Sequence, residues 1–309
     1  MNSLMNTGIL LTLLLTWPGL PAQQLQQAGN STPVKPYIEY LPGELPLIIS
    51  IPHGGYLIPD EIPDRPCTDC AKNQDIYTLE IGLRLREEIY LRTGSYPHVI
   101  ISHLHRTRLD PNRNITEAAS GNSLAEEAWH EFHNLIDSAR NRVARDFGKG
   151  LYIDLHGHRH ELKRTEIGYL FTGEELQLDD EMLDFETFVE YSSIRNLVAV
   201  NVNRISHTGL LRGESSLGAM FEKHGYPAVP SPVNPFPKTN EPYFPGGYDT
   251  RRHGSSSGGT IDGIQIELDL ELRSDETRRN IFAADLADIL ISYITTHYFP
   301  DIFLHDQDT

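Results

Sequence analysis

The chain has 309 residues, of which 39% are hydrophobic, which is enough to bury a sizeable core. It carries 26 Lys and Arg against 43 Asp and Glu, giving a formal net charge of −17. Because nucleic acids and anionic membranes attract basic surfaces, this balance argues against both as partners. The acidic composition favours solubility and does not identify a substrate.

The first 22 residues have the features of an export signal. Residues 9–17 are apolar but too few to span a bilayer, and a small residue, Ala22, follows them. We expect residues 1–22 to be a cleaved signal peptide, residues 23–36 a flexible lead-in, and residues 37–303 a single catalytic α/β domain. No later segment resembles a transmembrane run. The mature protein is therefore expected to be soluble, without a membrane anchor, and secreted or periplasmic.

Two further features bear on an exported protein. The only cysteines, Cys67 and Cys70, are close in sequence, which predicts a local disulfide rather than a redox centre. The sequons at Asn30 and Asn114 have meaning only in a eukaryotic secretory pathway.

Short apolar runs alternate with helical patterns along the chain, which predicts an α/β fold with a mainly parallel mixed sheet covered by helices on both faces. In the first half of the chain, the expected elements are a strand ending at His53, a helix from Asn73 or Asp75 to Arg92, a strand over 98–104, and a helix from Ser123 to Gly148 with a Ser123–Glu126 capping signal. Strands are then expected over 151–155, 167–173 and 195–203. A long ordered loop over 226–260, a strand over 261–272 and a helix from Ser274 to about Tyr298 complete the chain.

Two of the apolar runs end at a histidine followed by glycine. Residues 45–52 lead into His53, and residues 151–155 lead into His156. Ligands in open α/β sheets bind beyond the carboxyl ends of the strands, so neighbouring strands would bring both imidazoles to one crevice. Imidazole is the commonest metal ligand, and a catalytic zinc takes three protein ligands. We expect His53 and His156 to bind one Zn²⁺ per chain.

The third ligand is expected to be a carboxylate at the start of the helix after His53. Asp75 is the first choice because it opens that helix, although it could instead be a helix cap. Glu80 lies deeper in the helix and is a weaker choice. His158 is a further candidate, as a ligand or as a residue supporting the site.

A zinc-bound water molecule also needs a base to accept its proton. Glu267, Asp269 and Glu271 alternate along an apolar strand, which places the three acids on one face. We expect Glu267 to point into the site and to act as the general base, with Asp269 and Glu271 on a solvated face.

Arginines cluster after the strand at 98–104. Arg106 or Arg108 is expected to stabilise a developing oxyanion, and Asn112 with Arg113 to clamp a substrate carboxylate, since guanidinium groups bind carboxylates with two hydrogen bonds. Salt bridges to Asp110 and other acids are the alternative explanation of this cluster. Further substrate-binding donors are expected from the long loop, namely Tyr248, Arg252 and His253.

Five segments in order resemble the N-formylglutamate amidohydrolase family. They are Pro52-His53-Gly54-Gly55, Arg108-Leu109-Asp110-Pro111-Asn112-Arg113, Asp154-Leu155-His156-Gly157, Gly246-Gly247-Tyr248 and Gln265-Ile266-Glu267. The resemblance implies a zinc-carboxypeptidase-like α/β fold and hydrolysis of an amide next to a carboxylate-bearing residue. In the related carboxypeptidases an Asn-Arg pair holds the substrate carboxylate and a strand glutamate is the base, and Asn112-Arg113 and Glu267 stand in matching contexts.

The main hypothesis is a zinc-dependent amidohydrolase that acts on a small N-acyl amino acid or a peptide. The export signal also favours an exported carboxypeptidase or a cell-wall or γ-glutamyl amidase. A hypothesis of another class is a metal-free module that binds anionic ligands through the arginine cluster.

Overall fold

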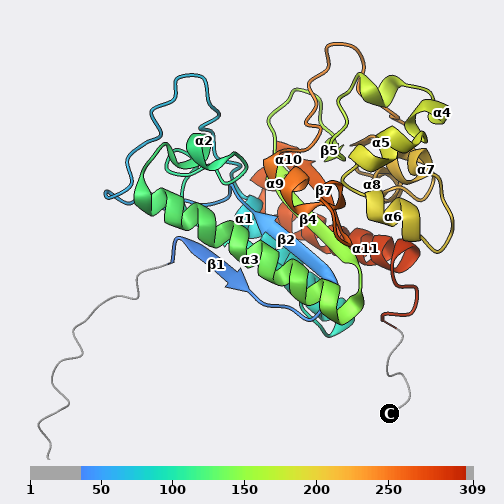
Figure 1. The fold of residues 1–309 in the computed structure, drawn as a ribbon, viewed down its shortest axis with the longest axis horizontal. Coiled ribbons are helices and arrows are strands. Elements are labelled where there is room, and N and C mark those ends of the chain that lie inside the picture. Colours follow the sequence, from blue (N-terminus) through green and yellow to red (C-terminus); the bar gives the residue numbers. More distant parts are fainter. Residues whose placement is uncertain (1–35, 304–309) are drawn as a thin grey trace, which may run out of the picture. The chain divides into compact units, whose positions relative to one another are not determined.

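A seven-stranded mixed sheet forms the centre of the part of the chain that this computed structural model describes, residues 36–303 (Figure 1). The expected signal peptide, most of the lead-in and the sequon at Asn30 lie outside the described residues. The strands are β1 Ile38–Leu41, β2 Leu47–Ile51, β3 His98–Ser102, β4 Gly150–Gly157, β5 Thr165–Gly168, β6 Ala228–Val229 and β7 Ile261–Leu268.

The sheet has the strand order β1-β3-β2-β4-β7-β5-β6. The four central strands β3, β2, β4 and β7 are parallel, whereas β1 pairs antiparallel with β3 and β5 pairs antiparallel with β7. The carboxyl ends of β2, β4 and β7 therefore meet at one edge. This places the residues that follow these strands side by side.

Helices cover both faces of the sheet, as the sequence predicts. Helices α1 Thr78–Thr93 and α11 Glu276–His297 pack on one face, and α3 Ser123–Phe147 lies along the other (Figure 1). Alternate residues of β2 enter two separate cores: Ile49 faces α1 and α11, while Ile48 faces α3. A parallel strand buried on both faces is apolar throughout, which explains the continuous hydrophobic run before His53.

The other helices are short, and α4 to α8 gather at one end of the sheet (Figure 1). They are α2 Ile115–Ala119, α4 Asp180–Leu183, α5 Glu186–Tyr191, α6 Arg195–Val200, α7 His207–Arg212, α8 Leu217–Lys223, α9 Tyr248–His253 and α10 Leu270–Ser274, with 3-10 turns η1 Glu175–Gln177 and η2 Ser255–Ser257. None of the described helices is long and apolar enough to cross a membrane.

Residues 195–203, expected as a strand, instead contain helix α6. The buried carboxylate of Asp262 on β7 accepts hydrogen bonds from the Leu197 backbone N–H at 3.1 Å and from the Asn196 side chain at 3.2 Å. These bonds satisfy donors in the first turn of α6, so a tertiary contact overrides the strand preference of this valine-rich segment.

Several expected element boundaries also differ from the structure. The strand expected over 261–272 ends at Leu268, because the Asp269 side chain accepts a hydrogen bond from the Glu271 N–H and caps α10. Asp269 is buried, unlike the solvated acid expected, and only Glu271 is exposed. The strand expected over 167–173 is β5, at Thr165–Gly168.

The helices begin at residues other than those expected. Helix α1 begins at Thr78 rather than at Asn73 or Asp75. Asn122, not Ser123, caps α3, and Asp275, not Ser274, caps α11. Gly94 ends α1 with a φ of 72°, a left-handed conformation that favours glycine.

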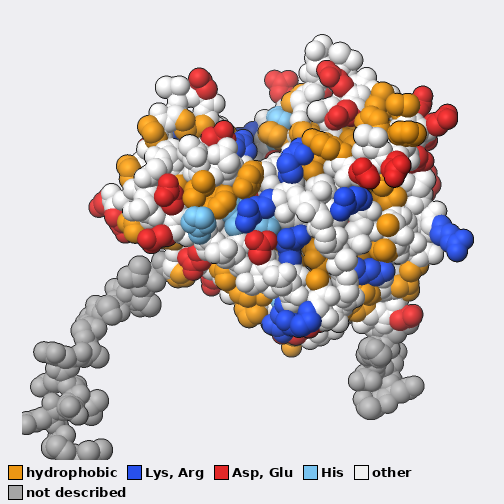
Figure 2. Space-filling view, in the orientation of Figure 1, with side chains coloured by type: hydrophobic (Ala, Val, Ile, Leu, Met, Phe, Trp, Pro, Cys, Tyr) orange, Lys and Arg blue, Asp and Glu red, His pale blue; other side chains and the backbone are white. Residues whose placement is uncertain are grey.

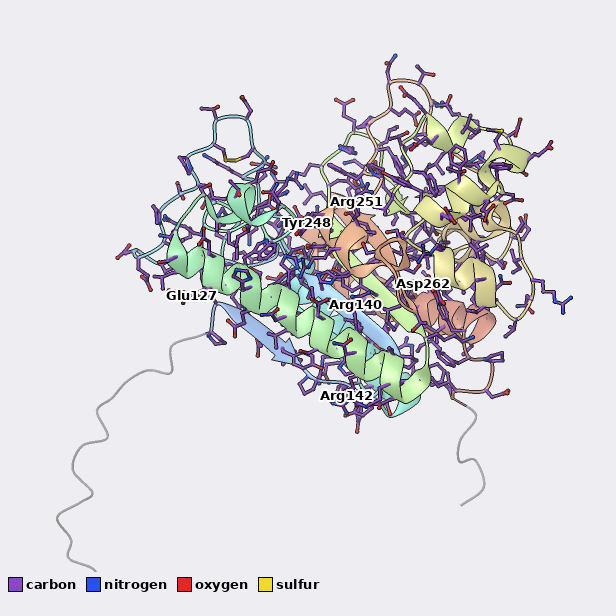
Figure 3. All side chains as sticks on the ribbon, viewed as in Figure 1. Glu127, Arg140, Arg142, Tyr248, Arg251 and Asp262 are labelled. Atoms are coloured by element: carbon purple, nitrogen blue, oxygen red, sulfur yellow. A yellow bond between two sulfur atoms is a disulfide. The ribbon has the colours of Figure 1, made fainter. Side chains whose placement is uncertain are left out.

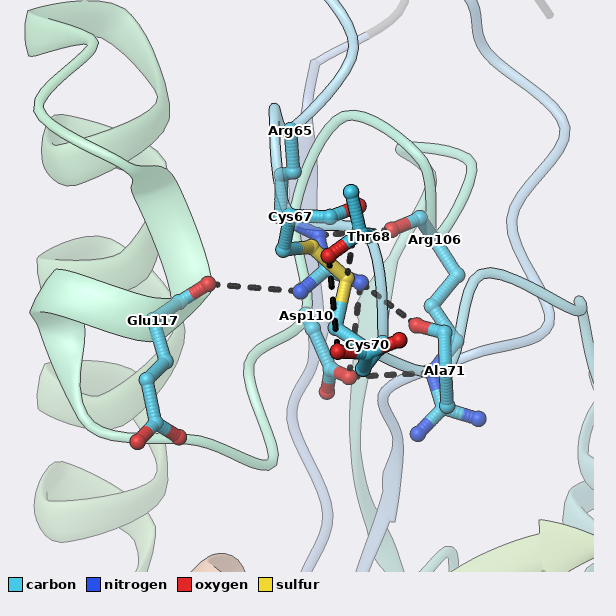
Figure 4. Close-up of a disulfide and its surroundings, with 9 residues drawn as sticks. Arg65, Cys67, Thr68, Cys70, Ala71, Arg106, Asp110 and Glu117 are labelled. Carbon is cyan, nitrogen blue, oxygen red and sulfur yellow. Dashed lines mark hydrogen bonds and ion pairs between the residues drawn. A yellow bond between two sulfur atoms is a disulfide. The ribbon is translucent and has the colours of Figure 1, made fainter.

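The long connection between β2 and α1 contains the expected disulfide, between Cys67 and Cys70 (Figure 4). Next to it, the buried Arg65 guanidinium donates to the backbone carbonyls of Ala71, Arg106 and Glu117. Arg65 also lies 3.6 Å from the Asp110 carboxylate. The disulfide loop is thereby joined to the segment that follows β3.

Candidate active site

The residues after β2, β4 and β7 form a cleft at the carboxyl edge of the sheet. Ser50 on β2 pairs with Asp154 on β4, so the positions of His53 and His156 differ by only one residue in this register. His156 is opposite Glu267 in the β4–β7 register. The cleft has a volume of about 370 Å³, and its walls include His53, Asp75, His156 and Glu267.

Three polar atoms converge at the floor of this cleft. The Nδ1 atoms of His53 and His156 are 3.1 Å apart, and the Oδ2 atom of Asp75 is 3.3 Å from the first and 3.2 Å from the second. All three residues are buried. The histidines are a hundred positions apart in sequence, and the sheet register brings them together.

The opposite nitrogen of each imidazole contacts a buried carboxylate. Nε2 of His53 is 2.7 Å from Asp110, and Nε2 of His156 is 3.1 Å from Asp154. A carboxylate only accepts hydrogen bonds, so each Nε2–H donates to its carboxylate, and a neutral ring then has its lone pair on Nδ1. Two lone pairs and a carboxylate oxygen then face one another, an arrangement that a cation stabilises.

The electrostatic field at this point favours positive charge. Burial alone would lower the pKa of His156, but Asp154 and Asp75 raise it well above its usual value. Burial alone would raise the pKa of Asp75, but hydrogen bonds from His156 and His53 hold it below its usual value. The cluster of His53, Asp75 and His156 therefore favours an ionised Asp75 carboxylate next to a bound cation.

The spacing of the three atoms fits a metal ion. A tetrahedral ion with bonds of about 2.0–2.1 Å needs ligand atoms about 3.3 Å apart. The observed separations are 3.1–3.3 Å. Carboxylates that hold the second nitrogen of ligand histidines are also typical of metal sites. His53, Asp75 and His156 could thus hold one ion with a coordination position open to the cleft.

Asp75 reaches the site from the loop before α1 and does not act as a helix cap. The residue preceding α1 is Tyr77, and Asp75 Oδ2 instead accepts the backbone N–H of Gly157 at 3.2 Å. The alternative ligand Glu80 is absent from the cleft walls and accepts a hydrogen bond from Tyr56.

His158 lines the cleft, but both of its ring nitrogens have backbone partners. Nε2 donates to the Arg164 carbonyl at 2.8 Å, and Nδ1 accepts the His160 N–H at 3.1 Å. The ring is therefore neutral and has no lone pair free for a metal ion. Although His158, His160 and Glu166 lie close enough together to suggest a metal group, these bonds argue against one.

Glu267 is a buried acid in the wall of the cleft. Burial raises its pKa to about 8, partly opposed by the positive charge of His156. Gln265, two residues earlier on the same face of β7, donates to Glu267 Oε1 at 3.2 Å. A carboxyl group poised near neutral pH can both accept and return a proton.

The expected arginines have different positions. Arg106 and Arg113 line the cleft, whereas Arg108 is not among its walls and donates to the Ile62 carbonyl at 2.6 Å. Arg106 donates to Asp110 at 3.0 Å, so part of the cluster does form salt bridges. No carboxylate of residues 36–303 forms an ion pair with Arg113.

Asn112 is buried beside the metal group. Its Nδ2 atom is 3.2 Å from His156 Nε2, and its Oδ1 atom accepts the Asp249 N–H at 2.9 Å. A Cβ on Gly247 would lie 2.4 Å from the Asn112 side chain, so only glycine permits this approach. Asn112 and Arg113 thus form one end of the cleft.

The structure does not bring Tyr248, Arg252 and His253 into the cleft. They belong to α9, whose residues Tyr248 and Arg251 are labelled near α3 in Figure 3. Arg252 lies over the Trp129 ring at 5.5 Å, and His253 is fully buried, with its Nε2 2.8 Å from His133 Nδ1. On this face Lys and Arg side chains gather over the middle of the sheet (Figure 2). These three residues are therefore not among the walls of the cleft.

His133, Asp249 and His253 form another group of potential ligands. The hydrogen bond between the two imidazoles uses one nitrogen of each ring, and all three residues are buried. This group lacks the open position of the cleft group.

Several residues of the site carry no clear signal in the sequence. Asp154 could have been found, because residues i and i+2 of a strand share a face and Asp154 therefore lies beside His156. The cleft residues Gln74, Arg159 and Phe244 come from loops with no periodic signal.

The carboxyl edge of the parallel strands thus carries two histidines and an acid that could hold a metal ion. The fold is similar to that of an N-formylglutamate amidohydrolase from Ralstonia eutropha JMP134. The TM-score is 0.50 and the sequence identity is 14%, and the match covers 85% of this chain and 98% of that chain. It is equally similar to the gene product Atu2144 from Agrobacterium tumefaciens, with 12% identity, a TM-score of 0.50, and coverage of 84% and 95%. No protein-family model matches the chain, and no curated protein matches its sequence. At these identities the similarity shows the fold alone, and this is the α/β fold that the motifs suggest.

Proposed function

We propose that this protein is a zinc-dependent amidohydrolase that cleaves an amide bond next to a carboxylate-bearing residue. The observation that carries the proposal is the convergence of three ligand atoms, 3.1–3.3 Å apart, beside the buried acid Glu267. The named activity of the amidohydrolase from Ralstonia eutropha is consistent with this chemistry.

His53, Asp75 and His156 would hold the zinc ion. When bound there, zinc would polarise the amide carbonyl and make a water molecule easier to deprotonate. Asp110 and Asp154 accept the Nε2 protons, so that the neutral rings would present Nδ1 to the ion, and the Gly157 N–H fixes the Asp75 carboxylate.

Glu267 would move the proton of the reaction. Its ionised carboxylate takes a proton from the attacking water as the oxygen bonds to the amide carbon. The same proton passes to the amide nitrogen as the C–N bond breaks, which releases an amine and a carboxylic acid.

Arg106 and the Asn112–Arg113 pair would bind the substrate. Arg106 lines the cleft and is oriented by Asp110, so its guanidinium can stabilise negative charge on the former carbonyl oxygen. Arg113 can pair with a substrate carboxylate, with Asn112 beside it. Arg108 lies outside the cleft walls and has no role in this proposal.

The substrate is proposed to be a small N-acyl amino acid or a peptide. An export signal would place the enzyme outside the cytoplasm, where a carboxypeptidase or a cell-wall or γ-glutamyl amidase would also act. Hydrolysis rates measured on N-acyl amino acids, on peptides with a free carboxyl terminus and on γ-glutamyl amides would distinguish these three activities.

The test is to measure zinc content and turnover in the wild type and in Glu267→Gln. We expect one zinc ion per chain in both proteins, and a fall in kcat of about 10²- to 10⁴-fold in the variant, because only the base is lost. Phe236→Ala, at an exposed site outside the cleft, is the control. A wild type without metal would instead support a binding module, and near-normal turnover in Glu267→Gln would remove the assigned base.

A further inference from the structure

One buried carboxylate fixes two rings in the wall of the cleft. Glu166 on β5 is fully buried, and its Oε1 is 2.9 Å from His160 Nδ1 while its Oε2 accepts the Phe244 N–H at 2.8 Å. The two rings stack with centroids 4.9 Å apart and planes 15° from parallel. Both line the cleft, and Phe244 remains 41% exposed. An exposed phenylalanine held in this way is a preformed binding surface.

The segment that carries Phe244 is fastened to β5 on both sides of the ring. The Tyr243 hydroxyl donates to the Ile167 carbonyl at 2.7 Å, and the Leu170 N–H donates to the Pro245 carbonyl at 2.6 Å. A Cβ on Gly168 would lie 2.5 Å from the Gly246 nitrogen, so the two backbones are in close contact. The stacked pair is therefore a rigid wall and does not need to be ordered by a ligand.

Arg113 and the stacked pair lie beside different segments: Arg113 lines a hollow with Cys67 and Cys70, whereas His160 and Phe244 are bound to Glu166 on β5. The Asn112–Arg113 segment follows β3. His53 follows β2, His156 lies near the end of β4, and Glu166 lies on β5. Asn112 lies at the metal group, 3.2 Å from His156, and Arg113 lies beside the disulfide loop. A substrate held by its carboxylate near Arg113, with its amide at the metal group, extends its acyl side towards His160 and Phe244.

We infer that the His160–Phe244 pair is a subsite for an aromatic acyl group, so that the preferred substrates are N-arylacyl amino acids rather than N-formyl or N-acetyl ones. This inference rests on the proposed amidohydrolase function. The exposed faces of the two rings offer stacking and edge contacts to a flat apolar group. The volume of about 370 Å³ leaves room for such a group, whereas a formyl group would leave the subsite empty.

The experiment compares kcat/KM for N-benzoylglycine and N-phenylacetylglycine with kcat/KM for N-acetylglycine. We expect the wild type to prefer at least one aromatic substrate, and Phe244→Ala to reduce that preference about 10-fold. Phe244→Leu, which keeps apolar bulk without a ring, should reduce it by less. Phe236→Ala should leave the preference unchanged because Phe236 is exposed in the same loop but outside the cleft. A preference for N-acetylglycine, or an aromatic preference unaffected in both Phe244 variants, overturns the inference.

A binding titration separates this inference from the proposed function. If no amide is hydrolysed, the affinities of the zinc-loaded protein for the same three compounds are measured by calorimetry. If the wild type binds an aromatic compound more tightly than N-acetylglycine, and Phe244→Ala loses this difference in affinity, the subsite is supported. The absence of hydrolysis then counts only against the proposed amidohydrolase function. Equal affinities for the three compounds reject the subsite.

Discussion

Two buried carboxylates determine which nitrogen of each imidazole faces the metal group. Asp154 accepts hydrogen bonds from Ser50 at 2.9 Å and from Thr250 at 3.3 Å, and its remaining contact is His156 Nε2. Asp110 is held in the same way by Arg106 and Arg65. Each carboxylate is thus fixed by its own neighbours, and the orientation of the ligand ring follows from it.

Replacing Asp154 by Asn should weaken metal binding. An amide has one acceptor oxygen, so it cannot accept from His156, Ser50 and Thr250 as a carboxylate does. We expect a 10- to 100-fold loss of zinc affinity, measured by competition with a chelator. Asp262→Asn is the matched control, since Asp262 is also fully buried and accepts several hydrogen bonds but lies away from the cleft (Figure 3). Equal affinities in the wild type and Asp154→Asn would show that this carboxylate does not orient the ligand.

Glu267 should make the metal-free protein less stable as the pH rises. Its pKa is about 8 in the folded protein against an ordinary value of 4.5, mainly because of burial. Between these values the unfolded chain releases the proton while the folded protein retains it, so the free energy of unfolding falls with increasing pH. Urea unfolding in the presence of EDTA should show the wild type losing stability relative to Glu267→Gln from pH 5 to pH 8. A difference that stays constant over this range would contradict the raised pKa.

At the scale of elements, one buried guanidinium joins the segments that carry the site. Arg273 in α10 donates to the carbonyls of Ile76, His158 and Leu268. These carbonyls lie one or two residues after Asp75, His156 and Glu267. A Cβ on Gly157 would lie 2.2 Å from the Arg273 Cζ, so the glycine makes room for the guanidinium. The relative positions of two of the proposed ligands and of the proposed base thus depend on a residue that is not among the cleft walls.

Replacing Arg273 by Lys should affect both stability and turnover. Lysine keeps the charge but cannot reach all of these carbonyls, and each buried carbonyl left without a donor costs about 1–3 kcal/mol. We expect the free energy of unfolding to fall by about 3 kcal/mol and kcat to decrease. Arg92→Lys, in a partly exposed ion pair between α1 and α11, should change stability by less than about 1 kcal/mol. Wild-type stability and turnover in Arg273→Lys would show that these bonds are dispensable.

For the molecule as a whole, the sequence predicts the sheet and the convergence of the site well. The apolar runs before His53 and His156 identify β2 and β4, and the rule that ligands bind at the carboxyl ends of parallel strands places both residues in one cleft. The predicted helices on both faces are confirmed, and so is the disulfide between Cys67 and Cys70.

The parts that the sequence did not predict depend on contacts distant in the chain. Helix α6 begins where Asp262 of β7 accepts its backbone N–H, and β7 ends where the Asp269 side chain turns back to cap α10. Local strand preference cannot reveal either contact. The position of α9 also depends on a distant contact. Its Gly-rich sequence with Tyr, Arg and His resembles a binding loop, but α9 packs against α3, and this packing buries His253.

A metal ion at this site would link three segments of the fold, and metal binding should therefore stabilise the whole molecule. His53 follows β2, His156 lies in β4 and Asp75 precedes α1, so the ion would hold together parts of the sheet and one helical layer. A ligand that binds only the folded state at about 1,000 times its Kd adds about 4 kcal/mol, which for a domain of this size raises Tm by about 10 °C. Thermal unfolding with zinc and with EDTA should show this difference in the wild type and lose it in His156→Ala. His224→Ala, which changes a histidine outside the cleft, should keep it. If zinc leaves the wild-type Tm unchanged, these three residues do not form a metal site in the folded protein.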